Sequence, residues 1–193
     1  GICPSRLSLI QIFLIPKSET DVRPIGVFAT LIRVLDRYVR RTYTARWIAA
    51  GDNSVHYGTA GRSVERAVWT SASLCECSAC LGRFSTSYLL DISKAFENIQ
   101  HGILVAAAKQ HGYSVMVIMW LVRLFQCDRA ISFQNCLSTL CRASKSVVPG
   151  SSHSDICMRL VLLVAIHGCR THFPRVMLSV VVDDVQGLVH GGN

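Results

Sequence analysis

The chain has 193 residues, of which half are hydrophobic and 17% are charged, so it can bury a sizeable core and is not a disordered tail. Twenty lysines and arginines against twelve acidic residues leave a net charge of +8, which favours a polyanionic partner. The nine cysteines follow no disulfide framework and no apolar run is long enough to span a bilayer, so we expect a reduced, intracellular protein, either nuclear or cytoplasmic.

The first half of the chain mixes strand-like and helix-like patterns. Residues 7–15 form an apolar run that predicts a buried strand, and residues 22–28 follow a polar turn as its hairpin partner. Apolar periodicity predicts a long helix over 29–48, then a glycine-containing loop over 50–61 and a second helix over 62–79.

The helix expected over 29–48 has two distinct sides. Leu31, Leu35 and Tyr38 fall on one side, and four arginines gather on another: Arg33, Arg37, Arg40 and Arg41. Such an arginine face is usually a solvated helix surface. In a nucleic-acid enzyme it would equally well contact template phosphates, so both interpretations stay open.

The second half has more short elements. In chain order they are a strand over 88–91, helices over 100–111 and 114–126 separated by Gly112, a hairpin over 130–148, a helix over 153–168 ending at Gly168, and strands over 176–182 and 185–189. Mixed strands and helices in this order predict an α+β layered fold.

Two adjacent carboxylates, Asp183 and Asp184, stand between the last two strand-like runs. At a hairpin turn both side chains can project from the edge of a sheet, where they repel each other unless a divalent cation lies between them. Asp91 also ends an apolar strand. Carboxylates from two strands suit a pair of Mg²⁺ ions of the kind used in phosphoryl transfer, whereas the simpler interpretations are a hairpin turn and a helix cap.

Several motifs together resemble the reverse transcriptases of non-LTR retrotransposons and group II introns. Asp91-x-x-x-Ala95-Phe96 looks like motif A, and Val181-Val182-Asp183-Asp184 looks like motif C, with Val181 where the family usually has an aromatic residue. Residues 14–17 and 23–25 are similar to the fingers motifs, and Pro149-Gly150-Ser151-Ser152 occupies the place of motif B. The motifs follow the family's order along nearly the whole chain.

The resemblance implies a role for each matching position. Asp91 and Asp183 would ligate two Mg²⁺ ions, with Mn²⁺ as a substitute, and Asp184 would support them as the third catalytic carboxylate. The other four residues would contact the incoming dNTP: Lys17 and Arg23 at the triphosphate, Phe96 beneath the sugar, where it excludes a ribose 2′-hydroxyl, and Gly150 at a close backbone approach.

The resemblance also implies the architecture and the partners. We expect the fingers and palm of a right-hand polymerase, with a fingers-like portion over 1–85, a palm-like portion over 86–193, and an antiparallel palm sheet packed on helices. The chain stops after motif C, so we expect a piece of a larger polyprotein without its thumb. The expected partners are an RNA template, a DNA primer and dNTPs, with no membrane.

Alternative functions remain open from the sequence. One is a catalytically inactive nucleic-acid-binding remnant of such an element, and another is an RNA-dependent RNA polymerase palm, against which Phe96 argues. An unfolded translation of a pseudogene is a further possibility. Cys75, Cys77 and Cys80 are more simply incidental thiols than a zinc site, and the run from Ser151 to Asp155 is too local for a catalytic triad.

Overall fold

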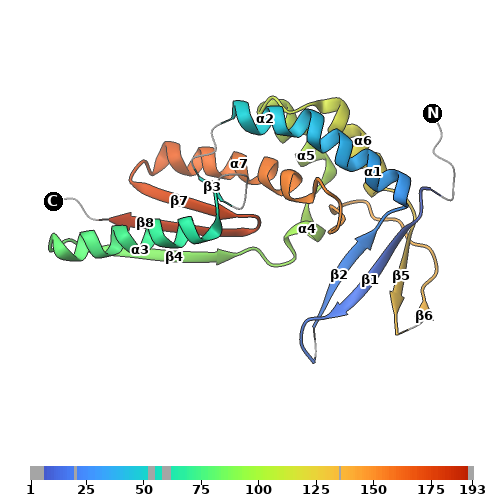
Figure 1. The fold of residues 1–193 in the computed structure, drawn as a ribbon, viewed down its shortest axis with the longest axis horizontal. Helices are drawn as coiled ribbons and strands as arrows, with labels where there is room; N and C mark the ends of the chain where they lie inside the picture. The colour runs from blue at the N-terminus through green and yellow to red at the C-terminus, as the bar shows by residue number, and fades with distance from the viewer. Residues whose placement is uncertain (1–6, 20, 52–54, 58–61, 135, 191–193) are drawn as a thin grey trace. The chain divides into compact units, whose positions relative to one another are not determined.

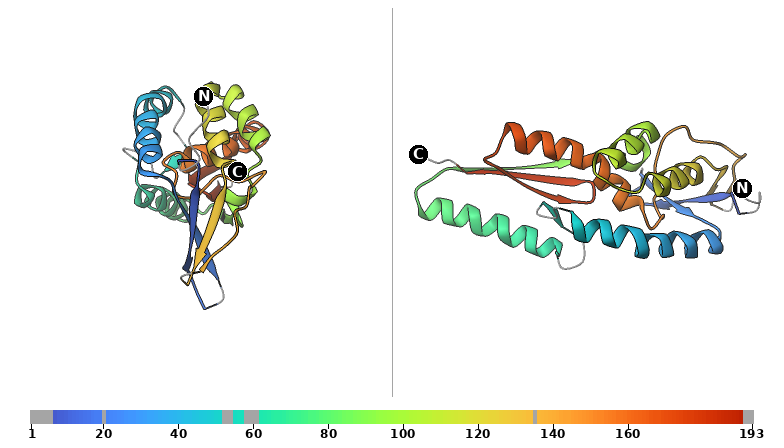
Figure 2. Two further views of the ribbon diagram at one scale, coloured as in Figure 1. Left: turned by 90° about the vertical axis from the view of Figure 1, so that its right-hand side faces the viewer. Right: turned by 90° about the horizontal axis from the view of Figure 1, so that it is seen from above.

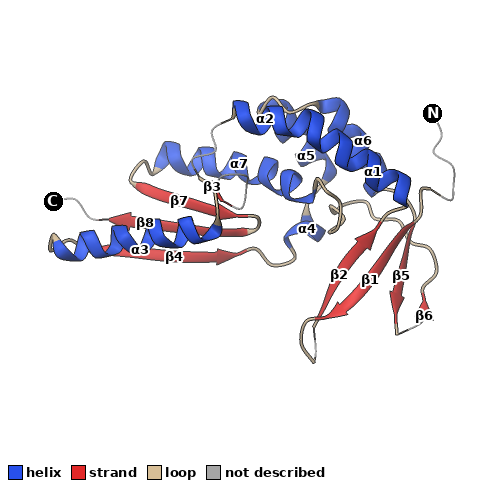
Figure 3. Ribbon diagram, in the orientation of Figure 1, coloured by secondary structure: helices blue, strands red, loops and turns tan. Residues whose placement is uncertain are grey.

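The chain forms two compact units, each built from two separate stretches of sequence. The computed structural model describes residues 7–19, 21–51, 55–57, 62–134 and 136–190. Unit 1 comprises Gly1–Ala49 with Lys94–Val161, and unit 2 comprises Ala50–Ser93 with Leu162–Asn193. Each unit has its own sheet and helices (Figure 1; Figure 3), which confirms the α+β class. The fingers-like and palm-like portions divided at residue 85 stay a prediction.

The sheet of unit 1 has the strand order β2-β1-β5-β6. Strands β1 (Ile10–Pro16) and β2 (Val22–Val27) pair antiparallel, which confirms the expected hairpin. Strand β5 (Arg129–Phe133) runs parallel to β1 and pairs antiparallel with the short β6 (Cys136–Leu137). The hairpin expected over 130–148 is therefore confined to its first residues.

The helices of unit 1 enclose most of its core. A nearly continuous helical segment consists of α1 (Thr30–Val39), the π-helical turn η1 (Arg40–Thr44) and α2 (Ala45–Ala50). The others are α4 (Ala95–Asn98), α5 (His101–Gln110), α6 (Val115–Phe125) and the beginning of α7 (Ser154–His172). Fully buried side chains from α5, α6, α7 and the 147–148 segment form this core: Leu104, Ile118, Leu121, Phe125, Val147, Val148, Ile156 and Leu160.

Unit 2 is built on a second sheet with the order β3-β7-β8-β4. Its strands are β3 (His56–Tyr57), β4 (Ser85–Asp91), β7 (Val176–Val181) and β8 (Asp184–His190). All neighbours pair antiparallel except β3 and β7, which are parallel. Helix α3 (Val64–Cys80) contacts β3, β4 and β8.

Helices cover both faces of the unit 2 sheet. On one face, Ser71 of α3 donates a hydrogen bond to Gln186 of β8 at 3.1 Å. On the other, the ring of Tyr88 lies over its cross-strand partner Gly187, and the nearby Cys169 of α7 adds to burial in raising the pKa of Tyr88. Figure 2 shows α3 running along the strands. This packing fixes the register of β4 on β8.

One expectation about helices was wrong in detail. Helix α7 continues past Gly168 to His172, because Gly168 does not adopt the left-handed conformation that ends a helix, as Gly112 does with φ +65°. In α1, Leu31 and Tyr38 are exposed (62% and 63%), whereas Ile32 and Asp36 are buried. Among the described residues, none of the helices is long and apolar enough to cross a membrane.

Candidate functional site

The three predicted catalytic aspartates gather at one end of the unit 2 sheet. Strand β4 ends at Asp91, strand β8 begins at Asp184, and these two residues are direct cross-strand partners. Side chains of directly opposed residues lie on the same face, with Cβ atoms about 4.5–5.5 Å apart. Asp183 precedes Asp184 in the β7–β8 turn. Strand pairing thus brings Asp91 and Asp184 together across more than ninety residues of sequence.

The β7–β8 turn differs from the expected one by a single residue. Val181 pairs with Asp184, so the two-residue loop is Val182-Asp183 and not Asp183-Asp184. Val182 has φ +57°, the left-handed region that a β-branched residue rarely adopts. A positive φ at the first loop residue is typical of a type II′ hairpin turn, where glycine is preferred. Strained backbone of this kind recurs at functional sites.

The three aspartate carboxylates can be reached from solvent, and within the described residues no cation balances their charge. Asp91 and Asp184 are exposed and Asp183 is half-buried. Within the part of the chain that the structure describes, none of the three side chains forms a hydrogen bond or an ion pair. Mg²⁺ is commonly held by one or two carboxylates together with substrate phosphates, and this donor set fits that mode.

In a second kind of metal site, protein side chains alone hold the ion. No group of three or more His, Cys, Asp or Glu side chains among the described residues is placed to hold a metal ion by itself. Cys75, Cys77 and Cys80 all lie on α3 as free thiols; Cys77 and Cys80, three residues apart, share one helix face, and Cys75 lies on the other side. Metal binding at the aspartates would therefore need further oxygen ligands, from water or from a bound phosphate.

The predicted triphosphate ligands lie on the β1–β2 hairpin of unit 1. Lys17 follows β1 in the turn, and its ammonium lies 4.0 Å from the Asp21 carboxylate in an exposed ion pair. Arg23 is an exposed residue of β2, opposite Ile15. An exposed ion pair contributes little to stability, so Lys17 is free to exchange Asp21 for a phosphate.

Phe96 and Gly150 belong to unit 1 as well. Phe96 is a half-buried residue of α4, and its carbonyl accepts a hydrogen bond from Val147 N at 2.8 Å. Gly150 has φ +108°, and a Cβ there would overlap the carbonyl of Gly26 on β2. The structure thus explains Gly150 by close contact with the β1–β2 hairpin, and a role at the nucleotide stays a prediction.

A buried polar network in unit 1 was not predicted from the sequence. His153 Nδ1 lies 2.5 Å from the Asp36 carboxylate, and its Nε2 lies 3.2 Å from the Thr44 hydroxyl. Thr44 also bonds Tyr113 at 2.7 Å, and Arg40 forms a two-pronged ion pair with Asp155 at 2.8 Å. The only available signal was an aspartate one turn after the apolar Ile32, because an acid at a core position requires a partner.

The network holds segments together; its members Asp36, Thr44, Tyr113 and His153 are buried, whereas Arg40 and Asp155 are partly exposed. His153 and Thr44 have no exposed surface. Burial by itself would raise the pKa of Asp36, but hydrogen bonds from His153 and Ser152 outweigh it and lower that pKa. Burial raises the pKa of Tyr113 to about 12. Because Asp36, His153 and Thr44 are buried, we interpret their hydrogen bonds as a link between α1, η1 and the start of α7.

Comparisons with known proteins identify the fold. No family model and no curated protein matches the sequence. Among solved structures, apo telomerase from Candida tropicalis aligns over 98% of this chain with a TM-score of 0.69 and 12% identity. A form lacking the C-terminal domain gives 0.66, with 10% identity over 97% of the chain. Telomerase from Candida albicans, in complex with a TWJ fragment of telomeric RNA, gives 0.58, with 14% identity over 97%.

These similarities concern the fold. Telomerase is related to reverse transcriptases, so the chain has a reverse-transcriptase-like fold. The chain spans less than half of those proteins, covering 41%, 45% and 38% of their lengths in the order given above.

Proposed function

We propose that this chain is the fingers-and-palm part of an RNA-directed DNA polymerase. The observation that carries the proposal is the pairing of Asp91 with Asp184 at the end of the sheet, directly after Asp183 in the turn. The reverse-transcriptase-like fold supports it. From the motif resemblance we further propose that the chain derives from an enzyme of the non-LTR retrotransposon or group II intron kind.

In the proposed reaction, a primer 3′-hydroxyl attacks the α-phosphate of a dNTP, forms a phosphodiester bond and releases pyrophosphate. Two Mg²⁺ ions, when bound, would supply charge stabilisation at the attacking and leaving oxygens. Asp91 and Asp183 would hold them, and the exposed Asp184 would add negative charge beside them.

The remaining roles concern the dNTP. Lys17 and Arg23 would bind the triphosphate and stabilise the charge that develops on pyrophosphate. The ring of Phe96 would lie beneath the sugar and exclude a 2′-hydroxyl, and Gly150 would keep the backbone close to the nucleotide. An RNA template and a DNA primer would be the remaining partners.

The test is extension of a DNA primer on an RNA template with Mg²⁺ or Mn²⁺. We expect addition of dNTPs, and loss of addition in Asp183→Asn by a factor of at least about 10², a loss typical when a transition-state stabiliser is removed. Asp128→Asn is the matched control, because Asp128 is ion-paired with Arg142 at the surface of unit 1.

The other outcomes identify the alternatives. Equal use of rNTPs and dNTPs would favour an RNA-dependent RNA polymerase. Binding of the primer–template without extension under any condition would favour an inactive remnant. Extension that survives Asp183→Asn would remove the aspartates from the chemistry.

A further inference from the structure

The helical segment α1–η1–α2 carries an unusual excess of positive charge. It holds five arginines and a single acidic residue, Asp36. Asp36 is turned into the core, where His153 and the backbone N–H of Ser152 bind its carboxylate. That carboxylate therefore does not neutralise the arginines at the surface, which are Arg33, Arg37, Arg41 and Arg46.

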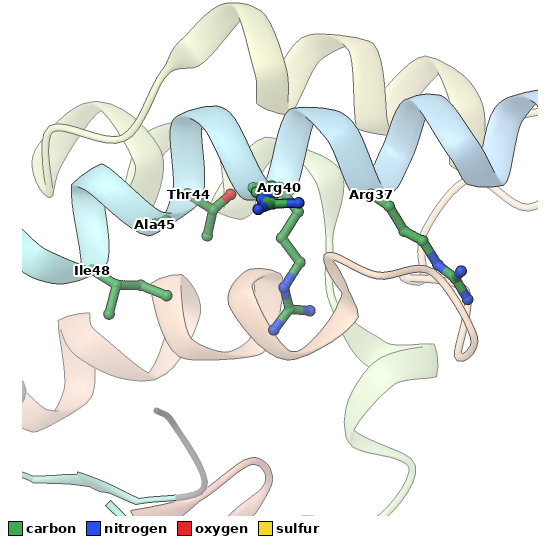
Figure 4. A pocket seen from close by; sticks show the side chains of 6 residues that line it. Arg37, Arg40, Thr44, Ala45 and Ile48 are labelled. Atoms are coloured by element: carbon green, nitrogen blue, oxygen red, sulfur yellow. The ribbon is translucent and has the colours of Figure 1, made fainter. Parts of the chain in front are cut away.

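A hollow of about 240 Å³ lies along this segment where the helix widens into the π-helical turn. Its lining comes from successive turns of one helix side: Arg37, Arg40, Arg41, Thr44, Ala45 and Ile48 (Figure 4). The volume is below the usual range for drug-sized ligands, so a small group such as a phosphate suits it better than a large cofactor. π-helical turns occur frequently at functional sites.

The arginines at this hollow play different parts. Arg40 is already engaged, because its guanidinium bonds both oxygens of Asp155 and the carbonyl of Ser152. Arg37 and Arg41 are exposed, and no acidic side chain in the described ranges pairs with either. Arg40 is thus held in place at one side of the hollow. The guanidinium groups of Arg37 and Arg41, which line the same hollow, carry positive charge that no acidic side chain of the described ranges balances.

We propose that this hollow binds backbone phosphates of a single-stranded RNA, at a site separate from the aspartates. Guanidinium groups bind phosphate oxygens through paired hydrogen bonds. The exposed ring of Tyr38, next to Arg37 in sequence and one turn before Arg41, can stack on a base of the same strand. The proposal rests on the proposed function for its choice of RNA as the polyanion.

The test is binding of a fluorescein-labelled, mixed-sequence single-stranded RNA, followed by anisotropy over a range of salt concentrations. For the double variant Arg37→Gln/Arg41→Gln we expect at least tenfold weaker binding. The slope of log affinity against log salt should fall by about 0.7 for each phosphate that the variant no longer neutralises. Circular dichroism should be unchanged, since both side chains are exposed.

The matched control is Arg66→Gln/Arg83→Gln, which removes the same charge from exposed positions of unit 2. We expect it to weaken binding much less. Equal effects of the two double variants, or normal RNA binding by Arg37→Gln/Arg41→Gln, would overturn the proposal. Normal binding would instead leave the hollow to an acidic protein partner.

Failure of this proposal differs from failure of the proposed function. Asp183→Asn should bind the RNA as tightly as the wild type while losing primer extension. If the arginine variant loses RNA binding but the wild type never extends a primer, the phosphate site stands and the polymerase function does not. If primer extension depends on Asp183 while the arginine variant binds RNA normally, the polymerase function stands and the phosphate site does not.

Discussion

At the scale of single residues, Asp36 and His153 form a buried polar pair in unit 1. Asp36 Oδ1 contacts the ring nitrogen, and Oδ2 accepts bonds from Ser152 N at 2.6 Å and from the Ser151 hydroxyl at 3.2 Å. Burial opposes the charge on Asp36, and these hydrogen bonds more than offset it. The pair therefore joins α1 to the start of α7.

Replacement of Asp36 by Asn should destabilise the protein by about 1–3 kcal/mol at neutral pH, since an amide cannot accept all the hydrogen bonds that the buried carboxylate receives. The pKa of Asp36 is lower in the folded state than its ordinary value of 3.8. The stability that the charged carboxylate contributes is therefore fully present above the unfolded pKa, and it is lost as the pH falls through the folded pKa. Urea unfolding of wild type and variant should show the difference shrinking in acid.

The control for this prediction is Asp21→Asn, which changes an exposed carboxylate in the β1–β2 turn. It should alter stability little at any pH. A difference between wild type and Asp36→Asn that stays constant from neutral pH into acid would contradict the role given to the charged carboxylate.

At the scale of elements, the contact between β2 and the segment after Val148 connects the hairpin of unit 1 to its helical core. Gly26 N donates to Pro149 O at 2.6 Å. A Cβ at Gly26 would overlap Val148, and a Cβ at Gly150 would overlap the Gly26 carbonyl. Two glycines therefore permit the backbones to touch.

Replacement of Gly150 by Ala should lower the free energy of unfolding by about 1–3 kcal/mol from overpacking against backbone. Its φ of +108° adds strain for any residue with a side chain. Gly168→Ala is the matched change, inside α7 with open space around it, and should stabilise the protein by up to about 1 kcal/mol. Thermal or urea unfolding that ranks the two variants the other way would refute this contact.

Elements with strong local patterns were predictable, and those set by distant contacts were not. The β1–β2 hairpin and helices α5 and α6 follow from apolar patterns and turn residues. The π-helical turn does not, because it is held by bonds from Arg40 to Asp155 and from Thr44 to Tyr113, far along the chain. Similarly, the side of α1 that is buried depends on His153, which meets Asp36 only in the fold.

At the scale of the whole molecule, each unit takes residues from both halves of the chain. The glycine-containing loop expected over 50–61 begins at the first passage from unit 1 to unit 2, but the return of the chain to each unit was not predicted from the sequence. The motif resemblance predicted the three aspartates, and their catalytic role stays a prediction. Their register was not predictable from the sequence: the structure sets Asp184 directly opposite Asp91, with Asp183 in the turn.

The measurement that tests the central claim most directly is Mn²⁺ binding in the presence of a dNTP, followed by the electron paramagnetic resonance signal of free Mn²⁺. The wild type should remove Mn²⁺ from solution, and Asp91→Asn/Asp183→Asn should remove much less, because both proposed ligands are gone. Asp128→Asn should match the wild type. Equal Mn²⁺ binding by the wild type and the double variant would contradict a metal centre at these aspartates.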